Sequence, residues 1–468
     1  MSTQELKKTA AARRKKANPY SFLNAIRYGG PIAWISCLIM GFGNICAGQI
    51  VKGLIFMAIE AVVIWFMFTS GGGLHWLSMI GTLGDKETEK VWNDATGVYD
   101  YVIGDNSQEI LLYIVATLAI LVMLVVFWRA SVRSGYQAMS LRKEKKHVPS
   151  IWEDIKALFD GNIHKLLMSL PFMCIVIFTA IPLVYMMAMA FTNYSQVDDH
   201  LVLFDWVGLK NFASLFNAKS TIGSQFWSVL GWTLIWAFFA TFLNFFFGTF
   251  MAMIIERPTT HLKGLWRGIL SLTIAVPQFV SLLIIRSMFK QDGAVNTLLQ
   301  NIGILDKATA EVLPFLTNAN WARVLLIVVN LWVGIPYTVM QVTGILKNIP
   351  AEQYEAARID GANVVQQFIH ITLPYMIFVM TPYIITQFTG NINNFNIIYL
   401  LTGGGPTDVG ASAGKTDLLV TWLYKLSIDK REYNLGAVIG IFTFVVLAIV
   451  ALATYRSSGS YKDEEGFK

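Results

Sequence analysis

The chain carries the stretch LKNIPAEQYEAARIDGANVVQQFIHITLP at residues 346–374, a polar segment between two long apolar ones. Pro350 cannot continue a helix, so the apolar helix before it is expected to end there. Ala351 to Ile359 are strong helix formers, and Gly361 is placed to cap the short helix that they form. A second helix then leads to Pro374. We therefore expect a compact helical hairpin between two membrane-spanning segments.

The rest of the chain is unusually apolar. Of its 468 residues, 55% are hydrophobic and only 14% are charged, whereas soluble globular chains contain about 25% charged residues. This composition excludes a disordered chain and argues against a soluble enzyme. We predict an all-α polytopic membrane protein with eight transmembrane helices. They are expected at 53–69, 110–128, 167–191, 227–255, 267–288, 322–345, 372–390 and 435–455.

The charged residues between the apolar runs predict the orientation. Basic residues gather in the first thirty positions and in 129–146, whereas 71–108 holds six acidic residues and two lysines. Lys and Arg accumulate on cytoplasmic loops. Both termini are therefore expected in the cytoplasm, with 71–108 outside. This leaves one crossing between 31 and 70, so the Gly-interrupted stretch 31–50 is expected to be an interfacial or re-entrant helix.

These considerations predict four segments. Residues 1–30 form a basic cytoplasmic tail, and 457–468 form a second one. Residues 31–165 hold the interfacial helix, two spans and the acidic extracellular loop, and they end in an amphipathic helix at 151–167. Residues 166–456 form a six-span core that includes the hairpin 346–374.

The sequence contains no convincing motif for chemistry of its own. GASAGKT at 410–416 has three residues between its glycines where a phosphate-binding loop needs four, and it falls in a predicted extracellular loop. Cys37, Cys46 and Cys174 fit neither a disulfide framework nor a zinc site. Within the predicted spans, the ionisable residues that stand out are Glu60 and Arg286, and ion-coupled carriers usually hold more. We expect a pathway for a neutral polar solute, with no cofactor, metal or nucleic acid bound and with energy supplied by another chain.

The hairpin resembles the EAA motif of bacterial ATP-binding cassette importer permeases. In composition alone it could equally be a plain connection between two spans. The resemblance implies a type I importer core, in which this loop forms coupling helices that dock on the ATPase subunit. The residues that match the motif and its flanks are Glu355, Ala356, Ala357, Asp360, Gly361, Ile371, Leu373 and Pro374.

A closer similarity is to the MalF-type subunits of maltose importers. It rests on 329–350, 388–408, FTNY at 191–194 and VGLKNF at 207–212, within a matching region of about 165–456. The large extracellular domain of the best-known enteric form has no counterpart here. The resemblance implies import of maltose or maltodextrin across the bacterial cell membrane; a galacto-oligosaccharide, or an ion-coupled secondary carrier, is the alternative.

The same resemblance implies partners. They are a second, MalG-like permease, two MalK-like ATP-binding subunits that use ATP and Mg, and an extracellular sugar-binding protein. The chain itself is expected to be a multi-pass protein of the bacterial cell membrane, in contact with membrane lipid. The sugar is expected midway through the membrane, at positions that match the family site: Val333, Gly334, Tyr337, Gly390, Asn391 and Asn394. Asn amides both donate and accept hydrogen bonds, and a Tyr ring can stack on a pyranose.

Two points about this expected site stay open in the sequence. The asparagines near 391 could be ordinary helix-end residues. Gly390 stands where the best-known family member has an aromatic residue, so a stacking surface would be lost and the preferred sugar could differ. Asn244, in the middle of a span, is expected to make a hydrogen bond between helices instead of a ligand contact.

Overall fold

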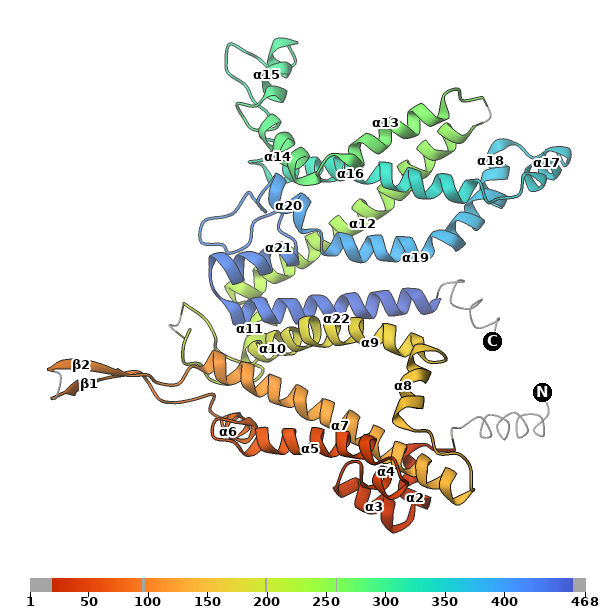
Figure 1. The fold of residues 1–468 in the computed structure, drawn as a ribbon. Coiled ribbons are helices and arrows are strands. Elements are labelled where there is room, and N and C mark those ends of the chain that lie inside the picture. The colour runs from red at the N-terminus through yellow and green to blue at the C-terminus, as the bar shows by residue number, and fades with distance from the viewer. Residues whose placement is uncertain (1–18, 95–96, 198–199, 258, 458–468) are drawn as a thin grey trace. The chain divides into compact units, whose positions relative to one another are not determined.

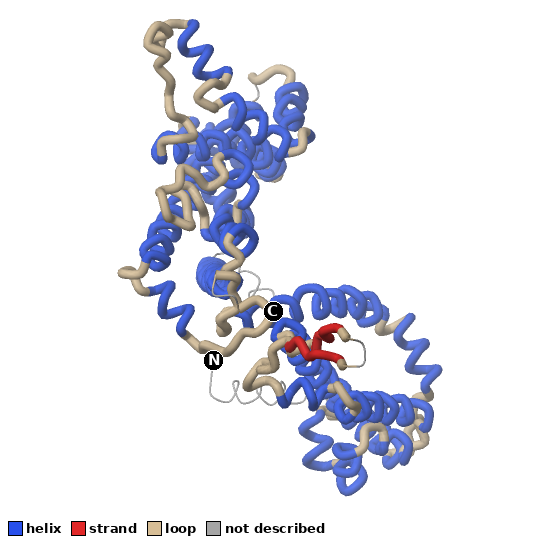
Figure 2. The backbone as a smooth tube through the Cα atoms, turned by 90° about the vertical axis from the view of Figure 1, so that its left-hand side faces the viewer, coloured by secondary structure: helices blue, strands red, loops and turns tan. Residues whose placement is uncertain are grey.

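A computed structural model of the chain describes residues 19–457 except 95–96, 198–199 and 258 (Figure 1). Most of the predicted tail 1–30, and nearly all of 457–468, lie outside the described residues. The described chain is mostly helical, with one pair of short strands, drawn red in Figure 2. Seven helices are long and apolar enough to cross a membrane, and one sharply bent pair brings the number to eight. The predicted all-α polytopic fold is confirmed.

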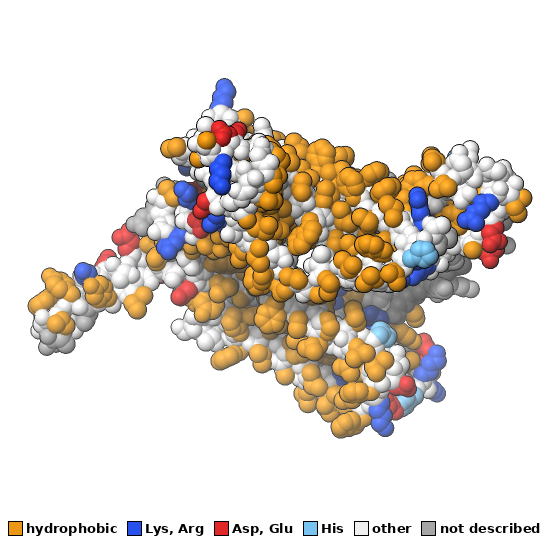
Figure 3. Space-filling view, turned by 90° about the horizontal axis from the view of Figure 1, so that it is seen from above, with side chains coloured by type: hydrophobic (Ala, Val, Ile, Leu, Met, Phe, Trp, Pro, Cys, Tyr) orange, Lys and Arg blue, Asp and Glu red, His pale blue; other side chains and the backbone are white. Residues whose placement is uncertain are grey.

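The chain divides into two compact units. The first comprises residues 1–188 with 200–206, and the second comprises 189–199 with 207–468. Many large hydrophobic side chains on the long helices are exposed. Figure 3 shows hydrophobic side chains, in orange, over much of the surface seen in that view. Exposed apolar surface of this extent is expected where lipid is the solvent.

The first unit is built from short helices packed on two long ones. Its elements are α2 (Phe22–Tyr28), α3 (Gly30–Leu38), α4 (Phe42–Cys46), α5 (Ile50–Phe68), α6 (Gly73–Ser78), β1 (Glu89–Asn93), β2 (Val98–Val102), α7 (Ser107–Lys143), α8 (Ile151–Phe159), α9 (Ile163–Ile175), η1 (Val176–Ala180) and α10 (Ile181–Met189). The last three run on as one 27-residue span. Neither α3 nor α4, in the stretch 31–50, reaches the length of a span.

Two features of this unit bear on the sequence expectations: the length of α7 and the environment of Glu60. The predicted span 110–128 is part of the 37-residue α7, because good helix formers continue through the basic stretch and no proline or glycine pair stops it. Glu60 on α5 accepts a hydrogen bond from the backbone N–H of Met40, at 2.8 Å. Its carboxylate is therefore used to hold the turn between α3 and α4.

The second unit is a bundle around three long helices. Its elements are α11 (Lys210–Phe216), α12 (Thr221–Glu256), α13 (Lys263–Ala275), α14 (Gln278–Met288), α15 (Ala294–Asn301), α16 (Ala319–Leu346), α17 (Ala351–Ile359), α18 (Val364–Gln367), η2 (Phe368–Thr372), α19 (Leu373–Ile392), α20 (Phe395–Leu401), α21 (Leu419–Tyr424), η3 (Lys425–Asp429) and α22 (Tyr433–Ser457). Helices α12, α16 and α19 pack together around Val339, Val342, Met376 and Met380.

The predicted span 267–288 is a broken helix. Its two halves, α13 and α14, meet at an angle of 87°. Pro277 lies at the break and has no N–H to continue the helical hydrogen bonds, while the residue before a proline avoids the helical conformation. Residues at the break line a cavity inside the unit, and irregular backbone at membrane depth is tolerated where it lines a cavity.

Candidate functional site

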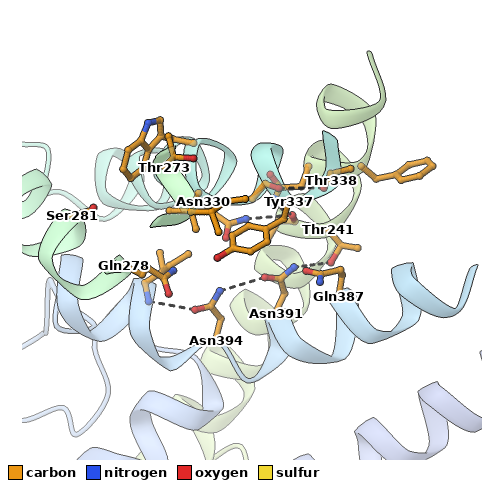
Figure 4. A pocket seen from close by; sticks show the side chains of 18 of the residues that line it. Thr241, Thr273, Gln278, Ser281, Asn330, Tyr337, Thr338, Gln387, Asn391 and Asn394 are labelled. Atoms are coloured by element: carbon orange, nitrogen blue, oxygen red, sulfur yellow. Dashed lines mark hydrogen bonds between the residues drawn. The ribbon is translucent and has the colours of Figure 1, made fainter. Parts of the chain in front are cut away.

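A cavity of about 370 Å³ lies inside the second unit, between α12, the α13–α14 break, α16, α19 and the start of α20 (Figure 4). Its size falls within the usual range for small-molecule sites, about 300–1,000 Å³. The side chains around it are neutral, and none of the lining residues is charged. The polar ones are Thr241, Asn244, Thr273, Gln278, Ser281, Asn330, Tyr337, Thr338, Tyr383, Gln387, Asn391 and Asn394.

Five of the six sequence-predicted sugar residues lie at this cavity. Val333, Gly334 and Tyr337 reach it from α16, and Asn391 and Asn394 reach it from the end of α19 and the start of α20. Gly390 does not line it, and a Cβ built there would meet no atom within 4 Å. The structure thus brings the two predicted stretches together, and the sugar-binding role of these residues stays a prediction.

The two asparagines are held in a defined network. Nδ2 of Asn391 donates to Oγ1 of Thr241 at 3.0 Å, and Nε1 of Trp236 donates to the Asn391 carbonyl at 3.0 Å. Asn394 caps α20, because its Oδ1 accepts from the backbone N–H of Ile397 at 3.3 Å. Both asparagines are therefore helix-end residues and cavity-lining residues at once, so the two interpretations of the sequence do not exclude each other.

Several lining residues were not anticipated from the sequence. Asn330 lies one helical turn before Gly334, and Gln387 lies one turn before Asn391, so each shares a helix face with an expected residue. Nδ2 of Asn330 donates to the carbonyl of Ala240 on α12, at 3.3 Å. Extending the predicted residues by one turn in each direction would have found both.

Helices α12 and α16 meet closely beside the cavity. A Cβ at Gly334 would lie 2.4 Å from Nδ2 of Asn244, and a Cβ at Gly248 would lie 2.5 Å from Thr338. Close approach at glycines is typical of membrane helix pairs. Asn244 does not make the expected bond between helices, since its Nδ2 donates to Ala240 within α12 at 2.7 Å. Its amide contacts α16 by packing.

The cavity suits a neutral, hydroxyl-rich solute. Amide and hydroxyl groups offer donors and acceptors on several sides, and Phe245, Trp332, Tyr337 and Tyr383 supply rings that can stack on the apolar face of a sugar. Pro336 lacks an N–H, which frees the carbonyl one turn earlier in α16. Among the described residues, no group of three or more His, Cys, Asp or Glu could hold a metal ion.

The hairpin 346–374 forms a second distinctive surface. Gly361 has φ +80° and ends α17, while the N–H of Ala362 donates to the Ala357 carbonyl at 2.8 Å. This is the expected glycine cap. Tyr354 and Thr372 join the two arms through their hydroxyls at 2.9 Å. A groove of about 300 Å³ between the arms is lined by Ala357, Asp360, Gly361, Ala362, Gln366, Gln367, His370 and Ile371.

The surface of this hairpin carries several exposed apolar side chains among its charged ones. Ile359 and Val364 are 85% and 71% exposed, and Val365 and Ile369 are exposed beside them. Glu355, Ala356 and Pro374 are also exposed, whereas Ile371 and Leu373 are half-buried. An exposed apolar patch with small residues and a groove is typical of a protein contact. Docking on an ATPase remains a prediction for these residues.

The GASAGKT stretch folds differently from a phosphate-binding loop. Nζ of Lys415 pairs with Asp408, and Oγ1 of Thr416 donates to the Gly405 carbonyl at 2.6 Å. The lysine and threonine that would hold phosphates are therefore engaged inside the loop itself. Nε1 of Trp422 on α21 donates to Oγ of Ser412 at 3.0 Å, so this stretch packs against α21.

Comparison with known proteins matches these features to a family. Residues 244–458 match the model described as "Binding-protein-dependent transport system inner membrane component". The chain is 36% identical over 438 residues to the galactooligosaccharides transport system permease protein GanP of Bacillus subtilis (strain 168), covering 92% of this chain and 99% of that protein. It is 33% identical over 439 residues to the maltodextrin transport system permease protein MalC of Streptococcus pneumoniae, covering 92% and 96%.

More distant relatives agree with the fold. The maltose/maltodextrin permease MalF of Salmonella typhimurium is 33% identical over 258 residues, which is 54% of this chain and 49% of that protein. The crystal structure of a bacterial alginate ABC transporter, in complex with an alginate-bound periplasmic protein, has a chain that superposes with a TM-score of 0.53 at 22% identity, covering 65% of this chain and 96% of that one. At this identity the likeness concerns the fold alone.

The family match covers the hairpin and most of the cavity, and the relatives span nearly the whole chain. The chain therefore belongs to the binding-protein-dependent inner membrane components, as a multi-pass permease subunit of a sugar ATP-binding cassette importer in the cell membrane.

Proposed function

We propose that this chain forms half of the pathway through which an ATP-driven importer carries a neutral hexose oligosaccharide, of the maltodextrin or galacto-oligosaccharide type, into the cell. The observation that carries the proposal is the cavity at the α13–α14 break, with its amides, hydroxyls and rings and no charged lining residue. A charged solute would need a counter-charge in such a low-dielectric site. A neutral sugar needs only hydrogen bonds and a stacking surface.

In this proposal the sugar contacts Tyr337 by stacking and the asparagines 391 and 394 by hydrogen bonds. Tyr337 is 49% exposed and lines the cavity, so its ring is accessible to a solute. Asn391 is largely engaged by Thr241, and Asn394 still has donor capacity toward the cavity. Val333 and Gly334 shape the wall between them.

The energy for transport comes, in this proposal, from two separate ATP-binding subunits that bind the hairpin 346–374. The exposed apolar residues of α17 and α18 seat in a groove of the ATPase, and Glu355 sets the orientation of the contact. Because η2 continues directly into α19, a movement of the hairpin is transmitted along α19 to Asn391. A second, homologous permease completes the pathway, and both termini lie in the cytoplasm.

One experiment tests the proposal and separates its two sugar candidates. The chain is purified with its partners from its native membrane and reconstituted in liposomes. Uptake of radiolabelled maltotriose and of a β-galactotriose is then measured with ATP inside and outside in turn. We expect ATP-dependent uptake of one of them, with competition by the other weaker by about tenfold or more. Maltodextrin is favoured by the MalC-type and MalF-type relatives, and galacto-oligosaccharide by the GanP relative.

The opposite outcome would favour a carrier of another class. If the purified chain carries sugar without any ATPase, and an uncoupler abolishes uptake, the proposal fails. Against this class stands Glu60, whose carboxylate holds the backbone of Met40. An ion-coupling group would need to be free to change its protonation state or ligand.

A further inference from the structure

A twisted β-hairpin forms an arm on the first unit. The aromatic arm, as we define it, comprises residues 85–94 and 97–105, with β1 and β2. Strands β1 and β2 pair antiparallel with Trp92 opposite Tyr99 and Lys90 opposite Tyr101. Side chains of directly opposed residues share a face. One face of the arm therefore carries Lys90, Trp92, Tyr99 and Tyr101.

The rings on this aromatic face lie in ordered contact and are exposed. Trp92 and Tyr99 pack edge to face with centroids 4.9 Å apart, and Nζ of Lys90 lies 5.3 Å from the centre of the Tyr101 ring. Trp92, Tyr99 and Tyr101 are 49%, 61% and 62% exposed. Large exposed aromatic side chains in a fixed arrangement are characteristic of binding hot spots.

The base of the arm is closed by hydrogen bonds between its two sides. Oδ2 of Asp105 accepts from the backbone N–H groups of Asp85 and Lys86, each at 3.1 Å, and the N–H of Gly104 donates to Thr88 at 3.1 Å. Figure 1 shows the strands continuing beyond the ends of α6 and α7, away from the helices of that unit. The arm therefore reaches past the end of the span instead of folding back along it.

This direction, together with the charge of the arm, indicates a protein partner. Residues 85–105 hold six acidic residues and two lysines, a net charge of −4. Segments drawn to lipid headgroups by charge are basic, so the acidic arm has no such attraction to a lipid surface. A two-stranded hairpin by itself is at best marginally stable in water. A partner with a basic, apolar surface would complement both the charge and the exposed rings.

We propose that the aromatic arm is a docking site for the extracellular sugar-binding protein of the importer, which would meet it with a basic surface containing an apolar recess. The inference rests on the proposed function and on the expected extracellular position of residues 71–108. The arm would supply a contact separate from the sugar pathway. Its purpose would be to raise the affinity and the encounter rate of the loaded binding protein.

The test uses the complete importer in liposomes and measures ATP hydrolysis against the concentration of its binding protein. The test variant carries Trp92→Ser, Tyr99→Ser and Tyr101→Ser, and the matched control carries Val91→Thr, Val98→Thr and Val102→Thr on the opposite face of the same strands. For the test variant we expect the half-maximal concentration to rise about tenfold or more, as for loss of a hot spot. Basal hydrolysis should stay unchanged, and the control should shift less than about twofold. Equal behaviour of the two variants overturns the inference.

A second measurement tests the same contact without the triple variant, so its result does not depend on whether that variant folds. A photo-reactive benzophenone amino acid replaces Tyr99 alone in the otherwise unaltered importer. We expect crosslinking to the binding protein, and we expect its yield to fall in about 0.5 M salt, because salt screens attraction between exposed charges. Crosslinking to lipid alone overturns the inference. If the unaltered chain purifies without an ATPase, or no binding protein stimulates it, the proposed function itself has failed and this inference with it.

Discussion

Gly334 on α16 and Asn244 on α12 share one packing contact, in which a Cβ at the glycine would lie 2.4 Å from the amide nitrogen of the asparagine. We predict that Gly334→Ala lowers the yield of assembled complex and its thermal stability, because overpacking costs about 1–3 kcal/mol. Asn244→Ala should have a smaller effect, and the double variant should recover stability and uptake. Gly344→Ala, on the same helix with open space around it, is the control. A double variant that assembles normally but takes up no sugar would instead give Gly334 a direct role at the solute.

The ring of Tyr337 is expected to carry part of the sugar contact. Tyr337→Ala should reduce sugar uptake roughly tenfold, since loss of a stacking contact and a hydrogen bond removes about 1–3 kcal/mol. Complex assembly and basal ATP hydrolysis should be unchanged. Phe246→Ala, at an exposed ring on α12, is the control. Uptake that remains within twofold of the unaltered importer would remove Tyr337 from the site.

Substitutions on the hairpin 346–374 should separate ATP hydrolysis from transport. We predict that Glu355→Lys, or Ile359→Ser at the 85% exposed side chain, abolishes sugar-stimulated hydrolysis while the spans stay folded. The reason is that the hairpin is expected to transmit movement of the ATPase to the spans only when it is docked in one fixed orientation. Glu352→Lys, at another exposed position on the same helix, makes the same change of two charge units and serves as the control. Normal coupled uptake in Glu355→Lys would refute its role at the ATPase.

The cap of α17 makes a prediction about backbone conformation. Gly361 has φ +80°, which costs a residue with a Cβ about 1–2 kcal/mol, and asparagine tolerates this region better than other residues. The order of retained uptake should therefore be Gly361→Asn above Gly361→Ala above Gly361→Val. Reconstituted uptake at equal protein levels checks this order. If all three are equal, the hairpin does not need this turn.

Asp417, directly after the GASAGKT stretch, forms a buried ion pair with Lys425. Asp417 is fully buried, and its Oδ2 lies 2.7 Å from Nζ of Lys425, with a further bond from the Gly414 N–H. Removing one partner of a buried pair costs about 3–5 kcal/mol, because the other charge is left without compensation. Lys425→Met should therefore lower the unfolding temperature of the complex strongly. The double variant with Asp417→Leu should be milder, and thermal unfolding in detergent measures the difference. Equal losses in the two variants would refute the pairing argument.

The apolar runs and the charge pattern were sufficient to predict the number of spans, because each span must be long and apolar whatever its neighbours are. They could not predict the break at Pro277, since a proline within an apolar run can either kink or end a helix. Nor could they predict that α7 runs on through basic residues. Hydropathy marks where a helix leaves the lipid, whereas the helix itself continues for as long as good helix formers follow.

The site was partly predictable for a different reason. Tyr337 and Asn391 could be matched by motif, whereas Asn330 and Gln387 match no motif and become candidates only when the predicted helix faces are extended by one turn. Gly390 was expected at the site by correspondence, yet it does not line the cavity. Correspondence gives a position in the chain, and only packing decides which face of a helix that position presents.

The lack of charge around the cavity has an electrical consequence. Moving one elementary charge across a membrane involves about 2.3 kcal/mol for every 100 mV. A neutral sugar among neutral side chains moves no charge through this chain's half of the pathway. The membrane voltage would then neither drive nor oppose that step, and uptake would give no current and would run at the same rate in polarised and depolarised vesicles.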